Sequence, residues 1–280
     1  MLAIALALGS SLCWGVADFV GGVQSRKLPL VGVLLVSQAI GLVGLLVLVA
    51  VRGTAPPELS RLLPAIGAGL GGIAALALFY RALAIGTMSI VAPISATGVV
   101  VPVVVGIAIG DRPAAIQVVG IVAATIGVVL ASREHSGGDV TPADSSRSVI
   151  LALCAAVGFG TFFVGLRASA RADVAWALVA ARATGVLALA AVAWISHVHL
   201  SRVRQAFGPL AVMGILDLGA NGLYAIASRH GPLSVVAVAA SLYPLATVLL
   251  ARVVLGERVR RVQEVGIAAA LTGVVLIAAG

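Results

Sequence analysis

The sequence predicts an all-α integral membrane protein whose ten transmembrane helices form two inverted five-helix repeats. Three observations support this prediction: 61% of the 280 residues are hydrophobic, only 10% are charged, and the apolar residues fall into long runs. A soluble domain carries about 25% charged residues, whereas a membrane-spanning helix needs roughly 20 apolar residues. The composition therefore excludes an ordinary soluble enzyme, a disordered chain and a secreted disulfide scaffold.

Ten apolar runs of near-spanning length follow one another along the chain. They lack the alternation of a membrane β-barrel, so each is expected to be a helix. The first run has no basic segment before it and continues past a plausible cleavage length, so it is expected to be a retained helix rather than a signal peptide. The runs are 1–23, 30–51, 62–85, 88–109, 115–132, 148–167, 173–196, 209–228, 233–254 and 262–280.

The longest polar stretch, residues 133–147, is expected to link a first five-helix repeat (1–132) to a second (148–280). An offset of 146 residues superimposes two glycine-containing segments, 110–130 and 256–276. The most informative identities are Gly110/Gly256, Arg112/Arg258, Gln117/Gln263, Gly120/Gly266 and Gly127/Gly273. An offset of 145 residues aligns Trp14 with Phe159 and Gly15 with Gly160. Because five is odd, the second repeat would enter the membrane from the opposite side, as in alternating-access transporters.

Short motifs at matching places in the two repeats resemble a known family. They are Cys13-Trp14-Gly15 with Phe19, the pairs Gly110-Asp111 and Gly256-Glu257, and the glutamines Gln117 and Gln263. With these motifs, the chain resembles the EamA group of the drug/metabolite transporter superfamily. The resemblance implies export or exchange of amino acids, other metabolites or drugs, often driven by ion gradients. Related small multidrug transporters couple through a glutamate in helix one, where this chain has Asp18 later in the span.

Three charged residues lie inside the expected spans, where charges are costly and usually face a cavity or a partner. They are Asp18, Arg182 and Asp217. Arginine keeps its proton, so Arg182 is expected to pair with Asp217 or Asp18. Helical spacing places Asn221, Tyr224 and Ser228 on the same face as Asp217, and Trp14 on the same face as Asp18. These residues predict a substrate or proton pathway; the alternatives are hydrogen bonds that only fix packing and, for Asp18, a headgroup anchor.

Prolines and glycines suggest where the helices bend or pack. Pro93, Pro102 and Pro244 interrupt the expected helices 88–109 and 233–254, as a hinge, a cavity-lining carbonyl or a static kink. The small-residue spacing of Gly67 and Gly71 predicts close helix packing rather than a nucleotide site. Tyr80, near the end of its helix, is expected either to gate the pathway or to anchor at the interface.

The sequence favours a secondary transporter that moves a small metabolite, such as an amino acid or a drug, by alternating access with proton coupling. The alternative is a non-transporting membrane protein, either an intramembrane enzyme or a scaffold. We expect no enzymatic activity, cofactor or metal site. The expected partners are a small-molecule substrate and the lipid bilayer, with no nucleic acid, and the protein is expected to be a monomer or homodimer.

The arginine-rich composition is typical of a bacterial protein, so the bacterial inner membrane is the expected location. The orientation has two interpretations. The loops after odd-numbered helices carry more arginine and lysine than the opposite face, which would place the termini outside. The family resemblance implies cytoplasmic termini, and we follow the family.

Overall fold

The computed structural model consists of helices joined by short irregular segments in the residues that it describes, which confirms the predicted all-α class. These residues are 2–108, 114–132, 142–170, 172–198, 201–230, 239–240, 242–258 and 260–279, and no strand occurs within them. The helices are α1 (Leu2–Lys27), α2 (Leu30–Arg52), α3 (Leu59–Ile85), α4 (Met88–Ala96), η1 (Thr97–Val99), α5 (Val100–Ala108), α6 (Ala115–Ser132), α7 (Pro142–Ala170), α8 (Val174–Ile195), α9 (Ser201–Gln205), α10 (Phe207–His230), α12 (Tyr243–Leu255) and α13 (Arg261–Ala279).

Three expected boundaries differ from the observed helices. The run 88–109 divides into α4, η1 and α5, and the irregular turn at η1 follows Pro93 rather than coinciding with it. Pro244 lies in the first turn of α12, where a missing amide donor costs little, so it begins this helix instead of interrupting it. Residues 142–147 of the expected polar linker already belong to α7.

Five described helices are long and apolar enough to cross a membrane. They are Leu2–Lys27, Leu30–Arg52, Leu59–Ile85, Val174–Ile195 and the segment Ala143–Leu166 of α7. Ala115–Gly127 and Tyr243–Leu255 are apolar but shorter. Long apolar side chains remain exposed on these helices, as expected for a surface that contacts lipid.

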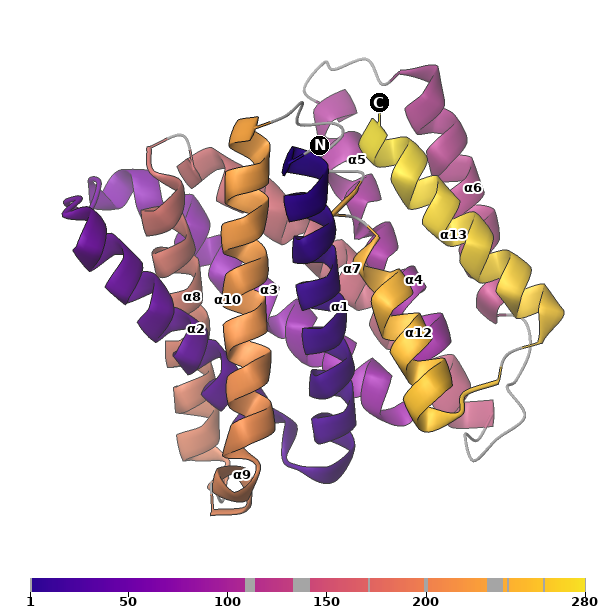
Figure 1. Ribbon diagram of the computed structural model, residues 1–280, viewed down its shortest axis with the longest axis horizontal. Coiled ribbons are helices and arrows are strands. Elements are labelled where there is room, and N and C mark those ends of the chain that lie inside the picture. The colour runs from indigo at the N-terminus through magenta and orange to yellow at the C-terminus, as the bar shows by residue number, and fades with distance from the viewer. Residues whose placement is uncertain are drawn as a thin grey trace.

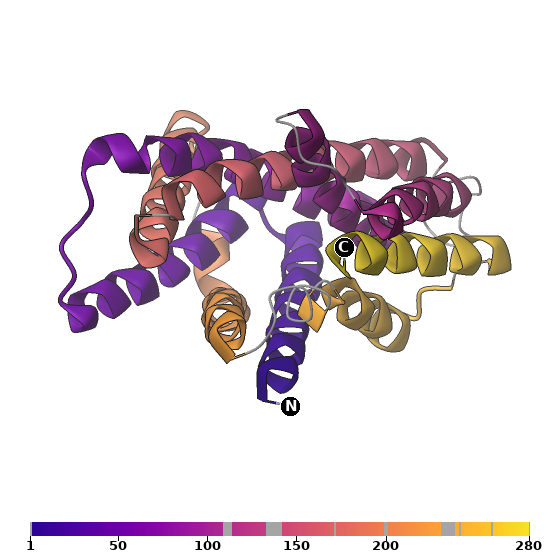
Figure 2. The same ribbon diagram turned by 90° about the horizontal axis from the view of Figure 1, so that it is seen from above.

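Helix α1 lies between α10 and α12 in the middle of the molecule (Figure 1). Helices α6 and α13 lie side by side at one end and α2 lies at the other (Figure 2). The start of α1 and the end of α13 are both at the upper edge of Figure 1, so α1 directs its Lys27 end toward the opposite face.

The contacts made by the two repeats are equivalent, which is clearest at two matched glycines. A Cβ atom on Gly15 of α1 would overlap Ala246 of α12, and one on Gly160 of α7 would overlap Val101 of α5. Ala246 follows Val101 by the same 145 residues that separate the two glycines. Each repeat therefore packs its first helix against the other repeat through the same close approach.

Helices α6 and α13, which the sequence offset makes equivalent, also pack on each other through equivalent residues. A Cβ atom on Gly120 would lie 2.8 Å from the carbonyl oxygen of Gly273, and one on Gly127 would lie 2.7 Å from that of Gly266. Later residues of α6 thus contact earlier residues of α13, so the two helices run antiparallel. Each helix presents the same two glycines to its partner.

The matched glutamines have the same local role in both repeats. Gln117 Oε1 accepts a hydrogen bond from the amide of Ala114, and Gln263 Oε1 accepts one from the amide of Arg260, each at 3.0 Å. Both glutamines stand in the first turn of a helix and satisfy the backbone donor just before it, which is one half of the capping-box arrangement. The glutamines explain why α6 and α13 begin at equivalent positions.

The prediction of close packing at Gly67 and Gly71 is wrong. No described side chain or neighbouring helix lies within 4 Å of a Cβ atom placed on either residue. The close contacts of α3 are instead made by Gly69, which approaches the backbone of Ala181 in α8, and by Gly72, which approaches Phe162 in α7. Glycine spacing indicates that one face of a helix lacks side chains, but it does not identify the neighbouring helix that packs on that face.

These glycines predict a difference in stability between two substitutions. Gly127→Leu should lower the midpoint of thermal unfolding in detergent, because the new side chain would overlap the α13 backbone. Overpacking of this kind costs about 1–3 kcal/mol. Gly67→Leu is the matched control and should leave the midpoint unchanged or raised, since nothing opposes its side chain. Equal midpoints for the two variants would contradict the packing described for α6 and α13.

Candidate functional site

An ion pair joins α8 to α10 inside the helix bundle. Arg182 Nη2 donates to Asp217 Oδ2 at 2.5 Å, and the two side chains are only 13% and 23% exposed. Gly41 of α2 leaves room for the guanidinium, because a Cβ atom at this position would overlap it. The other terminal nitrogen, Nη1, is buried without a hydrogen-bond partner among the described residues. The arginine therefore has a donor available for a further acceptor.

The polar face predicted on α10 begins at this ion pair. Asn221 Nδ2 donates to the backbone carbonyl of Asp217 at 2.6 Å, one helical turn along. Tyr224 follows on the same face and is half-buried. The side chain of Ser228, the last predicted member, lies outside the described residues. The described part of this face thus combines a carboxylate, an amide and a phenol.

A second carboxylate lies on α1, on the other side of α10. Tyr80 of α3 donates from its hydroxyl to Asp18 Oδ1 at 3.3 Å. The tyrosine ring packs against Gly21, where any side chain would displace it. Asp18 interacts electrostatically with Asp217, and Tyr80 with Arg182. The polar cluster is defined by these residues of four helices: Asp18, Tyr80, Arg182, Asp217 and Asn221.

Three aromatic residues stand beside the polar cluster. The ring of Trp14 on α1 has its centroid 6.1 Å from that of Tyr224 on α10 and 6.4 Å from that of Tyr243 on α12. Such distances are typical of favourable aromatic contacts. The aromatic group, Trp14, Tyr224 and Tyr243, thus joins the three helices at the middle of the molecule. Tyr243 was missed from the sequence, although it directly precedes the singled-out Pro244.

Buried hydrogen bonds hold α1 against both neighbours close to these groups. Ser10 Oγ donates to the carbonyl of Ala220 in α10 at 2.8 Å. Thr247 Oγ1 of α12 donates to the carbonyl of Gly15 at 3.0 Å. In lipid an unsatisfied hydroxyl is expensive, so both contacts satisfy a polar group and fix the position of α1.

The sequence-predicted residues are only partly brought together. Trp14, Asp18, Arg182, Asp217, Asn221 and Tyr224 all belong to the polar cluster or the aromatic group. Pro93 is buried in α4 and Pro244 in the first turn of α12. The side chain of Pro102 lies outside the described residues, as do Gly110 and Asp111. The hinge and kink interpretations of Pro93 and Pro102 both remain predictions.

A cavity in the described part of the protein lies outside the polar cluster, and the described residues form no candidate metal site. A cavity of about 330 Å³ lies between the end of α3 and the start of α7, and none of the predicted pathway residues lines it. Its lining residues are Arg81, Ile85, Asp144, Arg147, Ile150 and Leu151. No group of three histidine, cysteine or acidic residues that could bind a metal ion occurs in the described part of the chain.

Comparison with known proteins identifies the family. The model of a family described as the EamA-like transporter family matches residues 1–133 and 146–279, one match in each repeat. One solved structure, described only as the crystal structure of a protein, has a TM-score of 0.63 and 16% sequence identity, and the match covers 98% of this chain and 95% of that one. At this identity the likeness concerns the fold alone. No curated protein sequence matches the chain significantly.

The ion pair predicts a non-additive effect on stability. Asp217→Asn leaves the guanidinium of Arg182 buried without its counter-ion, and breaking such a pair costs about 3–5 kcal/mol. The double variant Arg182→Gln/Asp217→Asn should recover part of this loss in the thermal unfolding midpoint. Glu58→Gln, which removes an exposed ion pair with Arg61, is the control and should have little effect. If the losses in midpoint caused by Arg182→Gln and Asp217→Asn, each measured alone, add up to the loss in the double variant, the two residues do not form a stabilising pair.

Proposed function

Because the chain belongs to the EamA-like transporter family, we propose that this multi-pass membrane protein is a secondary active transporter of a small metabolite. It exports or exchanges an amino acid, a drug or a related compound by alternating access. We place it in the bacterial inner membrane, with ten transmembrane helices and both termini in the cytoplasm. The polar cluster and the aromatic group together form its substrate site.

The observation that carries this proposal is the unsatisfied donor of Arg182. A buried guanidinium that retains a free N–H edge can bind a carboxylate or phosphate of a substrate, and charged hydrogen bonds are the strong ones. Trp14 and Tyr224 supply an apolar surface beside it, with polar atoms at their edges. A zwitterion such as an amino acid meets both requirements, since Asp18 and Asp217 can face its ammonium group.

The equivalence of the two repeats supports alternating access. The antiparallel contact of α6 with α13 and the matched contacts of Gly15 and Gly160 fit a two-fold axis that relates repeats of opposite orientation. Transporters built in this way bind substrate where the repeats meet, near the middle of the membrane. The polar cluster suits this role, because Asp18 and Tyr80 come from the first repeat and Arg182 and Asp217 from the second.

Proton coupling follows from the charges in the polar cluster. Asp18 and Asp217 are near enough to interact unfavourably, and only one arginine is present among the cluster residues. One carboxylate is thus left without a cationic partner in a medium where unpaired charge is costly. A proton on that carboxylate neutralises the cluster, and the ammonium of a substrate can replace it.

A scaffold or an intramembrane enzyme accounts for the cluster less well. A scaffold gains nothing from a charged interior that costs stability. An enzyme needs a nucleophile and a base within hydrogen-bond reach. The hydroxyls of Ser10 and Thr247 donate to backbone carbonyls rather than to a base.

A comparison of metabolite levels tests the proposed function. Cells with and without the protein should differ in the accumulation and efflux of at least one small metabolite. Arg182→Ala should then slow the transport of that metabolite by tenfold or more, because a charged hydrogen bond contributes about 1.5–3 kcal/mol. Arg61→Ala, at an exposed position, is the control. Full transport by Arg182→Ala would remove this residue from the substrate site.

The coupling predicts a loss of pH dependence. In the double variant Asp18→Asn/Asp217→Asn no carboxylate of the polar cluster can take up a proton. Any transport that remains should therefore be independent of pH between about 5 and 8, whereas the unsubstituted protein should respond to a proton gradient. Glu264→Gln, at a half-exposed ion pair with Arg252, should keep the normal response. An unchanged pH profile in the double variant would contradict proton coupling through these residues.

A further inference from the structure

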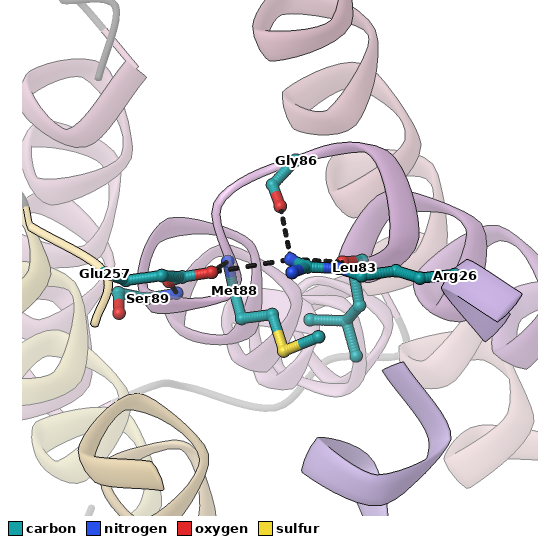
Figure 3. Close-up of polar contacts among 6 residues, drawn as sticks. All are labelled: Arg26, Leu83, Gly86, Met88, Ser89 and Glu257. Atoms are coloured by element: carbon teal, nitrogen blue, oxygen red, sulfur yellow. Dashed lines mark hydrogen bonds and ion pairs between the residues drawn. The ribbon is translucent and has the colours of Figure 1, made fainter. Parts of the chain in front are cut away.

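A carboxylate from the second repeat binds the start of a helix in the first repeat (Figure 3). Glu257 Oε1 accepts from the amide of Met88 and Oε2 from the amide of Ser89, both at 2.9 Å. These amides belong to the first turn of α4, where backbone donors have no partner within the helix. The positive end of the helix dipole favours an anion at this position.

Arg26, near the end of α1, binds the preceding helix in the complementary way. Its guanidinium donates to the carbonyls of Leu83 at 3.2 Å and Gly86 at 3.1 Å, at the negative end of α3. It also approaches Glu257 Oε1 at 3.5 Å. The cation therefore lies at the C-terminal end of one helix, the anion at the N-terminal end of the next, and the two charges meet across the turn (Figure 3).

Gly256 brings the carboxylate to this turn. It adopts φ +67°, a conformation that favours glycine, and ends α12 immediately before Glu257. Nothing lies within 4 Å of a Cβ atom placed on it, so the glycine serves the backbone conformation rather than close packing. This explains physically the Gly256-Glu257 motif noted in the sequence.

Both helices that carry the charged residues also line the substrate site. Helix α1 contributes Trp14 and Asp18 to that site before it reaches Arg26 at its far end. Helix α12 begins with Tyr243 of the aromatic group and ends next to Glu257. Helices α1 and α12 therefore connect the proposed substrate site to the turn between α3 and α4.

We propose that Arg26, Glu257 and the first turn of α4 form a gate that closes the path from the substrate site to the face opposite the two chain termini. The inference rests on the proposed function. The gate is closed in this structure, and it opens when Glu257 leaves the amides of Met88 and Ser89. With cytoplasmic termini this face is the periplasmic one.

The chemistry of these contacts suits a gate better than a permanent tie. Arg26 is 33% exposed, so solvent can replace the partners of its guanidinium, whereas Glu257, 12% exposed, is largely shielded and keeps its contacts only while α12 stays next to α4. Other contacts between the repeats include glycine backbones that approach each other along a helix, as at Gly127 and Gly266. A few charged hydrogen bonds at the edge can break while such steric contacts persist.

Access to the substrate site from each face tests the gate. Cys13 and Cys154 are first replaced by alanine, and Asn221→Cys then serves as the reporter. A charged, membrane-impermeant thiol reagent is added to sealed vesicles of either orientation, and the labelling rate from each face is measured. Glu257→Gln should raise the rate from the gate face by about tenfold and lower the rate from the other face, since one conformation gains population at the expense of the other.

Matched variants separate the gate from a general loss of stability. Glu264→Gln removes a carboxylate in the following helix that pairs with Arg252 rather than with the amides that bind Glu257, so this variant should be labelled at the same rates as the parent. Arg26→Gln should act in the same direction as Glu257→Gln, so the test does not depend on one variant folding. Glu257→Asp, which keeps the charge, should restore part of the closure.

The outcomes distinguish the gate from the proposed function. If the parent is labelled from one face and the labelling rates of Glu257→Gln and Arg26→Gln are the same as those of the parent, the gate is wrong, but the proposed transporter function stands. Labelling from neither face in any variant would overturn the water-accessible substrate site, and with it the proposed function. A reciprocal change in the two rates for Glu257→Gln, absent in Glu264→Gln, is the result that the gate requires.

Discussion

Helices in lipid gain nothing from burying apolar side chains against each other, because the lipid is equally apolar. They must associate through close backbone approach and through polar groups that lipid cannot satisfy. This constraint accounts for the placement of the glycines in this protein. Those at positions 15, 120, 127 and 160 face backbone or small side chains of a neighbouring helix, whereas Gly67 and Gly71 do not. The arrangement of the two repeats follows from the first set.

The same constraint explains why charged residues either lie next to one another in the interior or lie at the ends of helices near the edge of the bundle. In the interior, Arg182 and Asp217 form an ion pair, and Asp18 accepts a hydrogen bond from the hydroxyl of Tyr80. At the edge, Arg26 and Glu257 are placed on helix ends whose partial charges oppose their own. The interior charges retain an unused donor and an unpaired carboxylate. This incomplete satisfaction is the reason for proposing a binding site in the interior rather than a purely structural contact.

Much of the fold was predictable from the sequence, because hydrophobic runs and repeated residues depend on local spacing alone. The expected helix 30–51, for example, is observed as α2, Leu30–Arg52. What the sequence lacks is the identity of the neighbours across the bundle. The choice of Asp217 rather than Asp18 as the partner of Arg182, and the contact of Tyr243 with Trp14, depend on how helices from distant segments meet.

The role of Glu257 shows the same limit. Its glycine-glutamate motif was visible, but residues 88 and 89, whose amides it binds, are far away in the chain. Gly67 and Gly71 gave the opposite error, because a spacing that permits packing does not select the face that packs. Sequence spacing thus identifies residues that lie together on one helix, while the pairing of helices decides what those residues contact.

The two equivalent repeats hold two equivalent aromatic contacts, and they differ in chemistry. The offset of 145 residues relates Trp14 and Tyr224 to Phe159 and Phe79. The phenylalanine rings also touch, with centroids 5.7 Å apart, and Phe79 is fully buried. The fold therefore has two equivalent places that could hold a binding site. The rings of the first place, Trp14 and Tyr224, carry polar atoms. The rings of the second place, Phe159 and Phe79, carry none.

Charge follows the same asymmetry. The offset relates Asp18 to Phe163 and Asp217 to Gly72, so the second place has no equivalent of either carboxylate. Gly72 instead accommodates the ring of Phe162. The proposed alternating access needs equivalent helix contacts in both repeats, but one small substrate needs a single binding site. Filling the second place with phenylalanine keeps the packing on which the proposed motion depends and leaves one polar cluster between the repeats.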